Sequence, residues 1–123
     1  MPQLTPHFHS SEFDCRDGTP VPPRALRRYR HLCLALLEPM RREWGRCVIV
    51  SGFRTATHNS EVGGAPRSFH MLIPGRPGVA ADVTFERGTP TDWAAMANRL
   101  GAGGLGVYES TVHVDTRRAT ARW

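Results

Sequence analysis

Two histidines and one aspartate stand in settings that suit metal-assisted hydrolysis. Asp82 lies in the apolar run Val79–Phe85, where a carboxylate without a partner would be costly to bury. His70 and His113 each lie at a predicted strand edge or loop, among small residues and near a carboxylate. A His/Asp/His set matches a catalytic zinc site, whose fourth position holds a water that the ion activates. The spacing alone matches no local motif, so ordinary polar roles for these residues stay open.

Short helices and strands are predicted to carry these residues. Residues 1–22 look irregular, and apolar residues then recur at spacings of three and four, which predicts a helix. This helix opens at Pro22–Pro23 and closes at Gly45, and Pro39 is expected to bend it or end it early. The run Cys47–Val50 is short, apolar and rich in β-branched residues, which is typical of a buried strand.

The second half of the sequence predicts three more strands and one helix. Val79–Phe85 alternates enough for a strand, and Thr89–Asp92 begins a helix that Gly101 ends. Gly103–Tyr108 and Thr111–Asp115 predict a pair of late strands around a short turn. Because helices and strands do not alternate regularly, we expect an α+β fold with a small, largely antiparallel sheet packed against helices.

Length and composition limit the classes of function. The 123 residues suit a single domain over 1–123, which we expect to be a monomer. The net charge is +5 and all 16 basic residues are arginine, but they are scattered and lack the interleaved aromatics of a single-strand nucleic-acid platform. No apolar run approaches the roughly 20 residues that span a bilayer. We therefore expect neither a nucleic-acid partner nor membrane insertion.

The N-terminus and the cysteines bear on localisation. The first residues have no cationic start and no apolar stretch, so we expect no secretion signal. Cys15, Cys33 and Cys47 are far apart, form no CxxC pair and are odd in number, which argues against a disulfide framework and predicts buried free thiols. We expect a protein that stays cytoplasmic until release and then acts at the cell wall, or one exported by a leader removed from this sequence.

Four motifs occur in order along the chain: Ser51-Gly-Phe-Arg54, Ser68-Phe-His70, Gly78-Val-Ala-Ala-Asp82 and Val112-His113-Val-Asp115. Together they resemble the zinc D-alanyl-D-alanine carboxypeptidase and murein endopeptidase superfamily, which includes phage endolysins and shares its fold with the hedgehog signalling domain. That family's pattern is S-G-[YF]-R, then S-x-H-x-x-G-x-A-x-D, then V-H-x-D. The resemblance covers about Phe8 to Trp123, effectively the whole chain.

The resemblance implies a role for each matching residue. His70, Asp82 and His113 would be the zinc ligands. Arg54 would pair with a substrate carboxylate, for which its planar guanidinium fork is well shaped. Ser68, two residues before the first ligand, would form a hydrogen bond in the site or hold substrate.

Two features depart from the family pattern. Ile73–Pro77 is a five-residue insertion between the first histidine and the aspartate, and we expect it to protrude beside the metal and shape specificity. Several family members also use a glutamate three residues before the last histidine as general base, and here that position is Ser110. The candidates for the base are the neighbouring Glu109 and Asp115, and Asp115 has the second possible role of holding His113 in place.

Two hypotheses about function follow. The first is a zinc-dependent peptidase that hydrolyses a bond in peptidoglycan stem peptides with metal-activated water. D-Ala-D-Ala carboxypeptidase and murein endopeptidase activity are equally compatible with the motifs. The alternative is a non-catalytic cell-wall-binding or phage structural module that retains the metal site, and the missing family glutamate is its main support.

Overall fold

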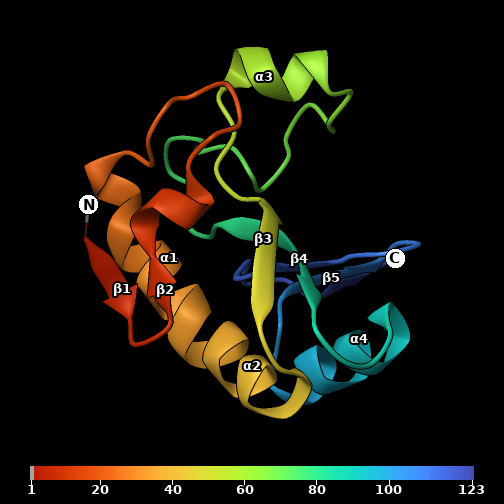
Figure 1. The fold of residues 1–123 in the computed structure, drawn as a ribbon. Coiled ribbons are helices and arrows are strands. Elements are labelled where there is room, and N and C mark those ends of the chain that lie inside the picture. Colours follow the sequence, from red (N-terminus) through yellow and green to blue (C-terminus); the bar gives the residue numbers. More distant parts are fainter. Residues whose placement is uncertain (1) are drawn as a thin grey trace.

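A five-stranded sheet with helices on one of its faces is the centre of the computed structural model, which describes residues 2–123 (Figure 1). The strand order is β3-β4-β6-β5-β7, and neighbours pair antiparallel except β5 and β7, which are parallel. The predicted α+β fold with a largely antiparallel sheet is confirmed. The strands are β3 (Cys47–Ser51), β4 (Ala80–Phe85), β5 (Gly104–Val107), β6 (Val112–Asp115) and β7 (Ala121–Arg122).

One long helical segment precedes the sheet. Of the two outcomes predicted for Pro39, an early end is not observed, because the helix continues to Trp44. A π turn directly before this proline replaces the regular pattern of backbone hydrogen bonds that a proline would interrupt. The segment comprises a 3-10 turn at Pro23–Ala25, α1 (Leu26–Leu32), the π turn at Cys33–Leu37 and α2 (Glu38–Trp44).

Residues 2–22 are more regular than predicted. β1 (Gln3–Thr5) and β2 (Phe8–His9) form a small antiparallel sheet, and a 3-10 turn follows at Ser10–Phe13. The ring centroid of the buried Phe13 lies 4.8 Å from that of Tyr29 in the helical segment. The expectation of an irregular start was wrong because two buried phenylalanines fix this region to the core, although it shows no helical or strand periodicity.

Two further helices complete the fold. α3 (Ala56–Glu61) follows β3 and lies apart from the other helices in Figure 1. α4 (Pro90–Arg99) lies between β4 and β5 in the chain and begins at the predicted place, with a capping box between Thr89 and Asp92. No helix within residues 2–123 is long and apolar enough to cross a membrane.

β3 is an edge strand with one exposed face. Its position in the sequence agrees with the prediction, but Val48 and Val50 are 47% and 46% exposed. The expectation of a buried strand was therefore wrong for one of its two faces. Cys47 and Ile49 point into the core, so the alternating Val48 and Val50 point to the opposite face of the sheet, where they meet solvent.

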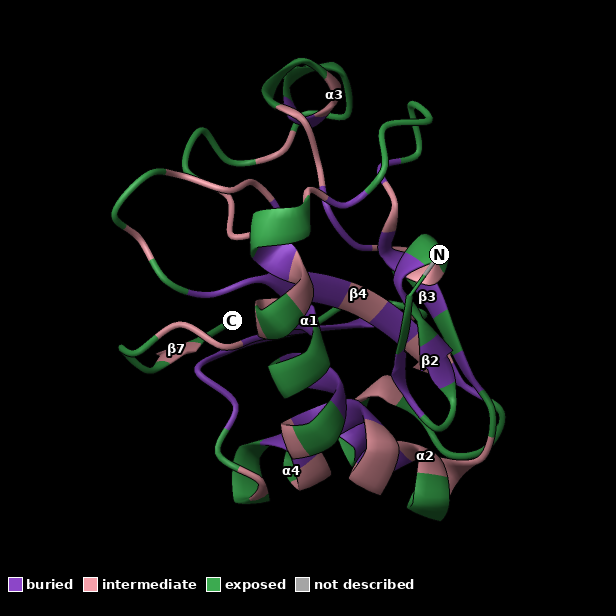
Figure 2. Ribbon diagram, turned by 90° about the vertical axis from the view of Figure 1, so that its left-hand side faces the viewer, coloured by how far each residue is buried: buried purple, intermediate pink, exposed green. Residues whose placement is uncertain are grey.

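The two faces of the sheet differ in polarity. Ala81, Val83 and Phe85 of β4 belong to the hydrophobic core. Asp82 lies between them in the sequence, and because side chains alternate along a strand it points to the opposite face. In Figure 2 the helical segment and α4 lie over the buried stretches of the strands. All three cysteines are buried and free, as predicted.

Candidate metal centre

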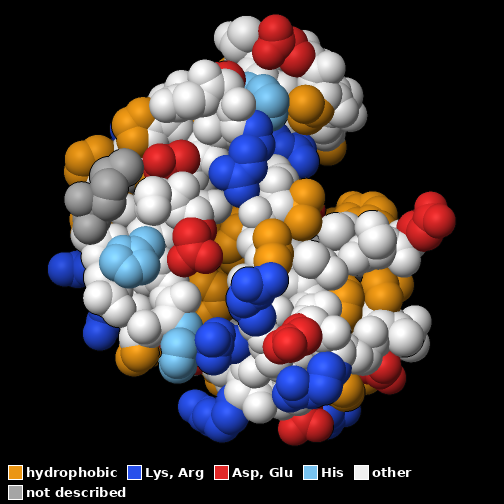
Figure 3. All heavy atoms as spheres, viewed as in Figure 1, with side chains coloured by type: hydrophobic (Ala, Val, Ile, Leu, Met, Phe, Trp, Pro, Cys, Tyr) orange, Lys and Arg blue, Asp and Glu red, His pale blue; other side chains and the backbone are white. Residues whose placement is uncertain are grey.

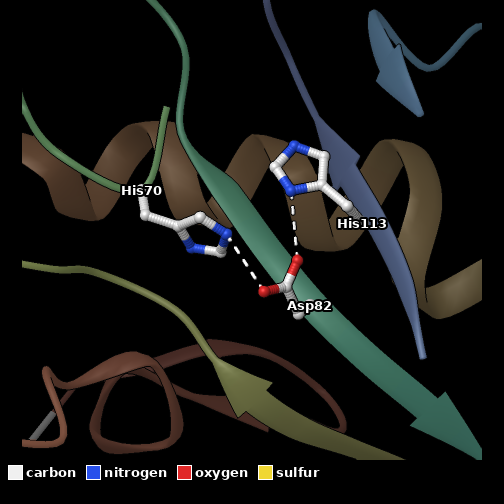
Figure 4. A group of neighbouring side chains, drawn as sticks. All are labelled: His70, Asp82 and His113. Atoms are coloured by element: carbon white, nitrogen blue, oxygen red, sulfur yellow. Dashed lines mark hydrogen bonds and ion pairs between the residues drawn. The ribbon is translucent and has the colours of Figure 1, made fainter. Parts of the chain in front are cut away.

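The structure brings His70, Asp82 and His113 together (Figure 4). Asp82 on β4 lies directly opposite His113 on β6 in the antiparallel ladder. His70 comes from residues 62–79, which contain no helix or strand. Nε2 of His70 lies 3.3 Å from Oδ2 of Asp82, and Nδ1 of His113 lies 3.1 Å from Oδ1. One ligand atom from each residue lies within 4.8 Å of the other two, a spacing that a single ion can bridge.

The second ring nitrogen of each histidine already has an acceptor. Nδ1 of His70 donates to the carbonyl oxygen of Gly52 at 2.7 Å, and Nε2 of His113 lies 2.8 Å from Oδ2 of Asp115. In the neutral rings, the nitrogens that face Asp82 therefore carry lone pairs. Lone pairs so close to a carboxylate repel it unless each ring takes a second proton or a cation lies among the three groups. Two imidazoles and one carboxylate are a donor set that zinc accepts, so these residues fit a metal ion.

Hydrogen bonds around the cluster keep its carboxylates ionised. Burial would raise the pKa of Asp82, but the hydrogen bonds that His113 and His70 donate when their rings are protonated outweigh burial and hold the pKa of this carboxyl well below its usual range. The pKa of Asp115 is lowered likewise, because hydrogen bonds from His113 and Arg117 outweigh its burial. Burial opposes the charge of His113, but its bonds to the two carboxylates raise its pKa above the ordinary value. The cluster is therefore electrostatically suited to a cation.

Asp115 is fully buried behind His113. Its carboxylate accepts hydrogen bonds from the backbone N–H of Gly104 at 2.7 Å and from the guanidinium of Arg117 at 2.7–3.0 Å. Gly104 has no space for a Cβ atom, which would overlap this carboxylate. Of the two roles predicted for Asp115, these contacts favour the one in which it holds His113, an arrangement typical of metal-binding imidazoles.

Glu109 does not join the cluster. It is exposed in the turn between β5 and β6 and does not line the cavity beside His113. Ser110, which occupies the position of the family's glutamate, is exposed in the same turn. Apart from Asp82, no carboxylate lines this cavity within residues 2–123. A role for Glu109 as general base therefore requires the turn to move.

Arg54 lies next to the cluster. One terminal nitrogen of its guanidinium lies 3.5 Å from Oδ2 of Asp82. The other donates to Oδ1 of Asn59 and Nε donates to Oγ of Ser51, both at 3.2 Å. Ser68 is also close, because its hydroxyl accepts the backbone N–H of His70 at 3.2 Å. The guanidinium is thus held at the cluster by three side chains, and it faces the cavity.

A cavity of about 950 Å³ opens beside the cluster. One wall is the loop that carries Ser68 and His70, and the opposite wall comes from the C-terminal strands. The space-filling view is hollowed where α3 and the following loop face these strands (Figure 3). Trp123 and Tyr108 line the cavity, joined by a hydrogen bond of 2.7 Å from the indole N–H to the phenol oxygen. The Trp123 ring centroid lies 4.9 Å from that of His113, so the C-terminal residue packs against a candidate ligand.

Sequence reasoning missed several residues of this site. Arg117 could have been found as a basic residue two positions after Asp115, close enough in the sequence to pair with its carboxylate. Trp123 and Tyr108 gave no comparable signal. The contact between these two side chains depends on the parallel pairing of β7 with β5, which local sequence patterns do not reveal.

The His/Asp/His cluster is a group of side chains that could hold a catalytic metal ion. The family model described as Peptidase M15 matches residues 6–116, and the chain belongs to this family of metal-dependent peptidases. The resemblance that the motifs indicated is therefore confirmed. Comparison with curated proteins and with solved structures gave no significant match.

Proposed function

We propose that residues 1–123 form a single zinc peptidase domain that hydrolyses a bond in peptidoglycan stem peptides. The observation that carries the proposal is the convergence of two histidine lone pairs and one carboxylate, with each histidine held from behind by an acceptor. His70, Asp82 and His113 would hold the zinc ion. When bound, zinc supplies an activated water and polarises the carbonyl of the bond to be cleaved.

The remaining residues would bind and orient the substrate. Arg54 would exchange its long contact to Asp82 for a paired interaction with a substrate carboxylate, which suits peptides that end in D-alanine. Ser68 would keep its hydrogen bond to the backbone of His70 and present its hydroxyl to the cavity. Asp115 would fix the tautomer of His113. Glu109 would accept the proton of the attacking water after a movement of its turn.

The second candidate is a module that binds the cell wall without cleaving it. Its support is that Asp82, itself a proposed ligand, is the one carboxylate that lines the cavity within residues 2–123. On this proposal the metal site stabilises the loop that carries His70, and peptidoglycan binds without hydrolysis.

Metal content and product analysis test the proposal together. We expect about one zinc ion per chain by elemental analysis of the wild type, and none in His70→Ala. Purified peptidoglycan incubated with the zinc-loaded wild type should release either free D-alanine or cleaved cross-links, which mass spectrometry distinguishes. Zinc binding without any product would favour the binding module. Wild-type protein that takes up no zinc after reconstitution would contradict both proposals.

A further inference from the structure

The insertion Ile73–Pro77 folds back onto the loop that carries His70. The guanidinium of Arg76 donates hydrogen bonds to the backbone carbonyl oxygens of Arg67, Ser68 and Met71, the last two at 2.8 and 3.2 Å. These carbonyls flank His70 on both sides in the sequence. Residues 62–79 contain no helix or strand, so these contacts add to the backbone hydrogen bond of 2.9 Å from Arg54 N–H to the carbonyl oxygen of His70 in fixing the backbone at this ligand.

A stack of side chains continues from Arg76 to the other histidine. The guanidinium carbon of Arg76 lies 3.8 Å from the centroid of the Phe69 ring, and that of Arg117 lies 4.1 Å from it. Arg117 in turn donates to the carboxylate of Asp115, which holds His113. Cation–π contacts and charge-assisted hydrogen bonds therefore form a continuous path from the loop that carries His70 to His113.

The surroundings leave this stack little freedom. Gly78 has a φ of +110°, and a Cβ atom at this position would lie 3.3 Å from the Phe69 ring and from the backbone nitrogen of Arg117. The carbonyl oxygen of Arg76 accepts a hydrogen bond of 3.4 Å from Arg28 of α1. The insertion is thus attached to the helical segment on one side and to the loop of His70 on the other.

We propose that Arg76 is a positioning residue for the metal ligand His70, and that the Arg76–Phe69–Arg117 stack couples this ligand to His113. The inference rests on the metal-binding part of the proposed function and not on which bond is cleaved. It adds a structural role to the expectation that the insertion shapes specificity. A planar guanidinium can satisfy three carbonyls at once, whereas a lysine ammonium at the same position cannot reproduce this geometry.

Zinc affinity, measured by competition with a chelating dye, tests the proposal in four variants. We expect Arg76→Ala to weaken zinc binding about 10- to 100-fold, as loss of a group that orients a metal ligand does. Arg76→Lys should recover little of this loss, and it serves in place of Arg76→Ala if that variant fails to fold. Phe69→Leu should weaken binding about tenfold or less, since it removes the ring and leaves the hydrogen bonds. Arg30→Ala, which removes an equal charge from an exposed position of α1, should match the wild type.

A spectroscopic signature separates positioning from a general loss of stability. With Co²⁺ in place of zinc, the visible absorption band reports the geometry of the ligands. We expect this band to change in Arg76→Lys and to stay unchanged in Arg30→Ala. An Arg76→Lys protein that melts at a lower temperature but binds zinc with wild-type affinity and an unaltered cobalt band would overturn the proposal.

A measurement on zinc-free protein keeps the inference separate from the proposed function. The Nδ1–H of His70 donates to Gly52, so nitrogen-15 NMR should show this proton protected from exchange in the wild type. We expect faster exchange in Arg76→Lys than in Arg30→Ala. If the wild type binds no zinc, the proposed function fails and this comparison still decides the inference. Equal exchange in the two variants would contradict it.

Discussion

The candidate metal centre has two halves that are built by different means. Asp82 and His113 occupy opposite positions of a strand ladder, and Asp115 supports His113 from the same strand. His70 belongs to a long loop and depends on the carbonyl of Gly52, on one backbone hydrogen bond from Arg54 and on hydrogen bonds between side chains and backbone. The strand half is therefore positioned by the fold itself, whereas the loop half is positioned by particular contacts. We expect substitutions in the two halves to differ in how they divide their effects between stability and metal binding.

The largest difference is expected between Asp82→Ala and His70→Ala. Both should abolish stoichiometric zinc binding. Asp82→Ala should also destabilise the zinc-free protein by about 2 kcal/mol, because it leaves Arg54 and protonated His113 without their shared, partly buried partner. His70→Ala should lower the unfolding free energy of the zinc-free protein by less than half of this amount. The loop that carries His70 keeps its other contacts to the rest of the protein. Urea unfolding of the two variants in chelator checks the difference, and equal losses would refute the division into two halves.

Asp115→Asn tests how the strand half holds its histidine. An amide in place of the carboxylate keeps the shape but removes the charge that stabilises the Nε2–H form of His113. We expect zinc affinity to fall about 10- to 100-fold with the fold intact. Glu109→Gln is the matched control, because it removes one carboxylate from an exposed turn and should leave zinc affinity unchanged.

The same two variants decide which carboxylate is the general base. If Glu109 accepts the proton, hydrolysis of peptidoglycan by zinc-saturated Glu109→Gln should fall at least about 100-fold, as removal of a general base does. Zinc-saturated Asp115→Asn should then retain more activity than Glu109→Gln. The opposite order would assign the base to Asp115.

Much of the strand half could be predicted from the sequence. Asp82 in an apolar alternating run, and His113 and Asp115 two residues apart, follow from the period of a strand and from the family motifs. The loop half could be predicted only in part. The motifs gave His70 and Arg54, but Arg76 lies in an insertion that those motifs do not contain. Its bonds to three carbonyls depend on the path of an irregular chain, which no local periodicity encodes.

Alanine substitutions of two glycines, one in each half, test the same difference with a smaller change. A Cβ at Gly104, on β5, would overlap the carboxylate of Asp115, and a Cβ at Gly64, in the loop, would overlap the side-chain oxygen of Asn59. We expect Gly104→Ala to destabilise the protein by about 2 kcal/mol, because the sheet fixes both partners. Gly64→Ala should cost less, since the loop can shift. Thermal unfolding of both variants measures the difference, and a larger loss for Gly64→Ala would contradict the rigid-sheet interpretation.

The smallest effect on the metal itself is expected at Arg54, which contacts both halves. Its guanidinium approaches Asp82 on β4, and its backbone N–H donates to the carbonyl oxygen of His70 at 2.9 Å. Because its contact to Asp82 is long, Arg54→Ala should leave zinc bound at wild-type stoichiometry. Loss of a charge-assisted hydrogen bond to the substrate carboxylate should nevertheless lower kcat/KM about tenfold or more. Arg54→Lys, which keeps the charge without the planar fork, should recover only part of this loss. If Arg54→Ala instead released zinc while substrate affinity stayed unchanged, Arg54 would belong to the support of the metal site, and the carboxylate anchor would have to be another residue of the cavity.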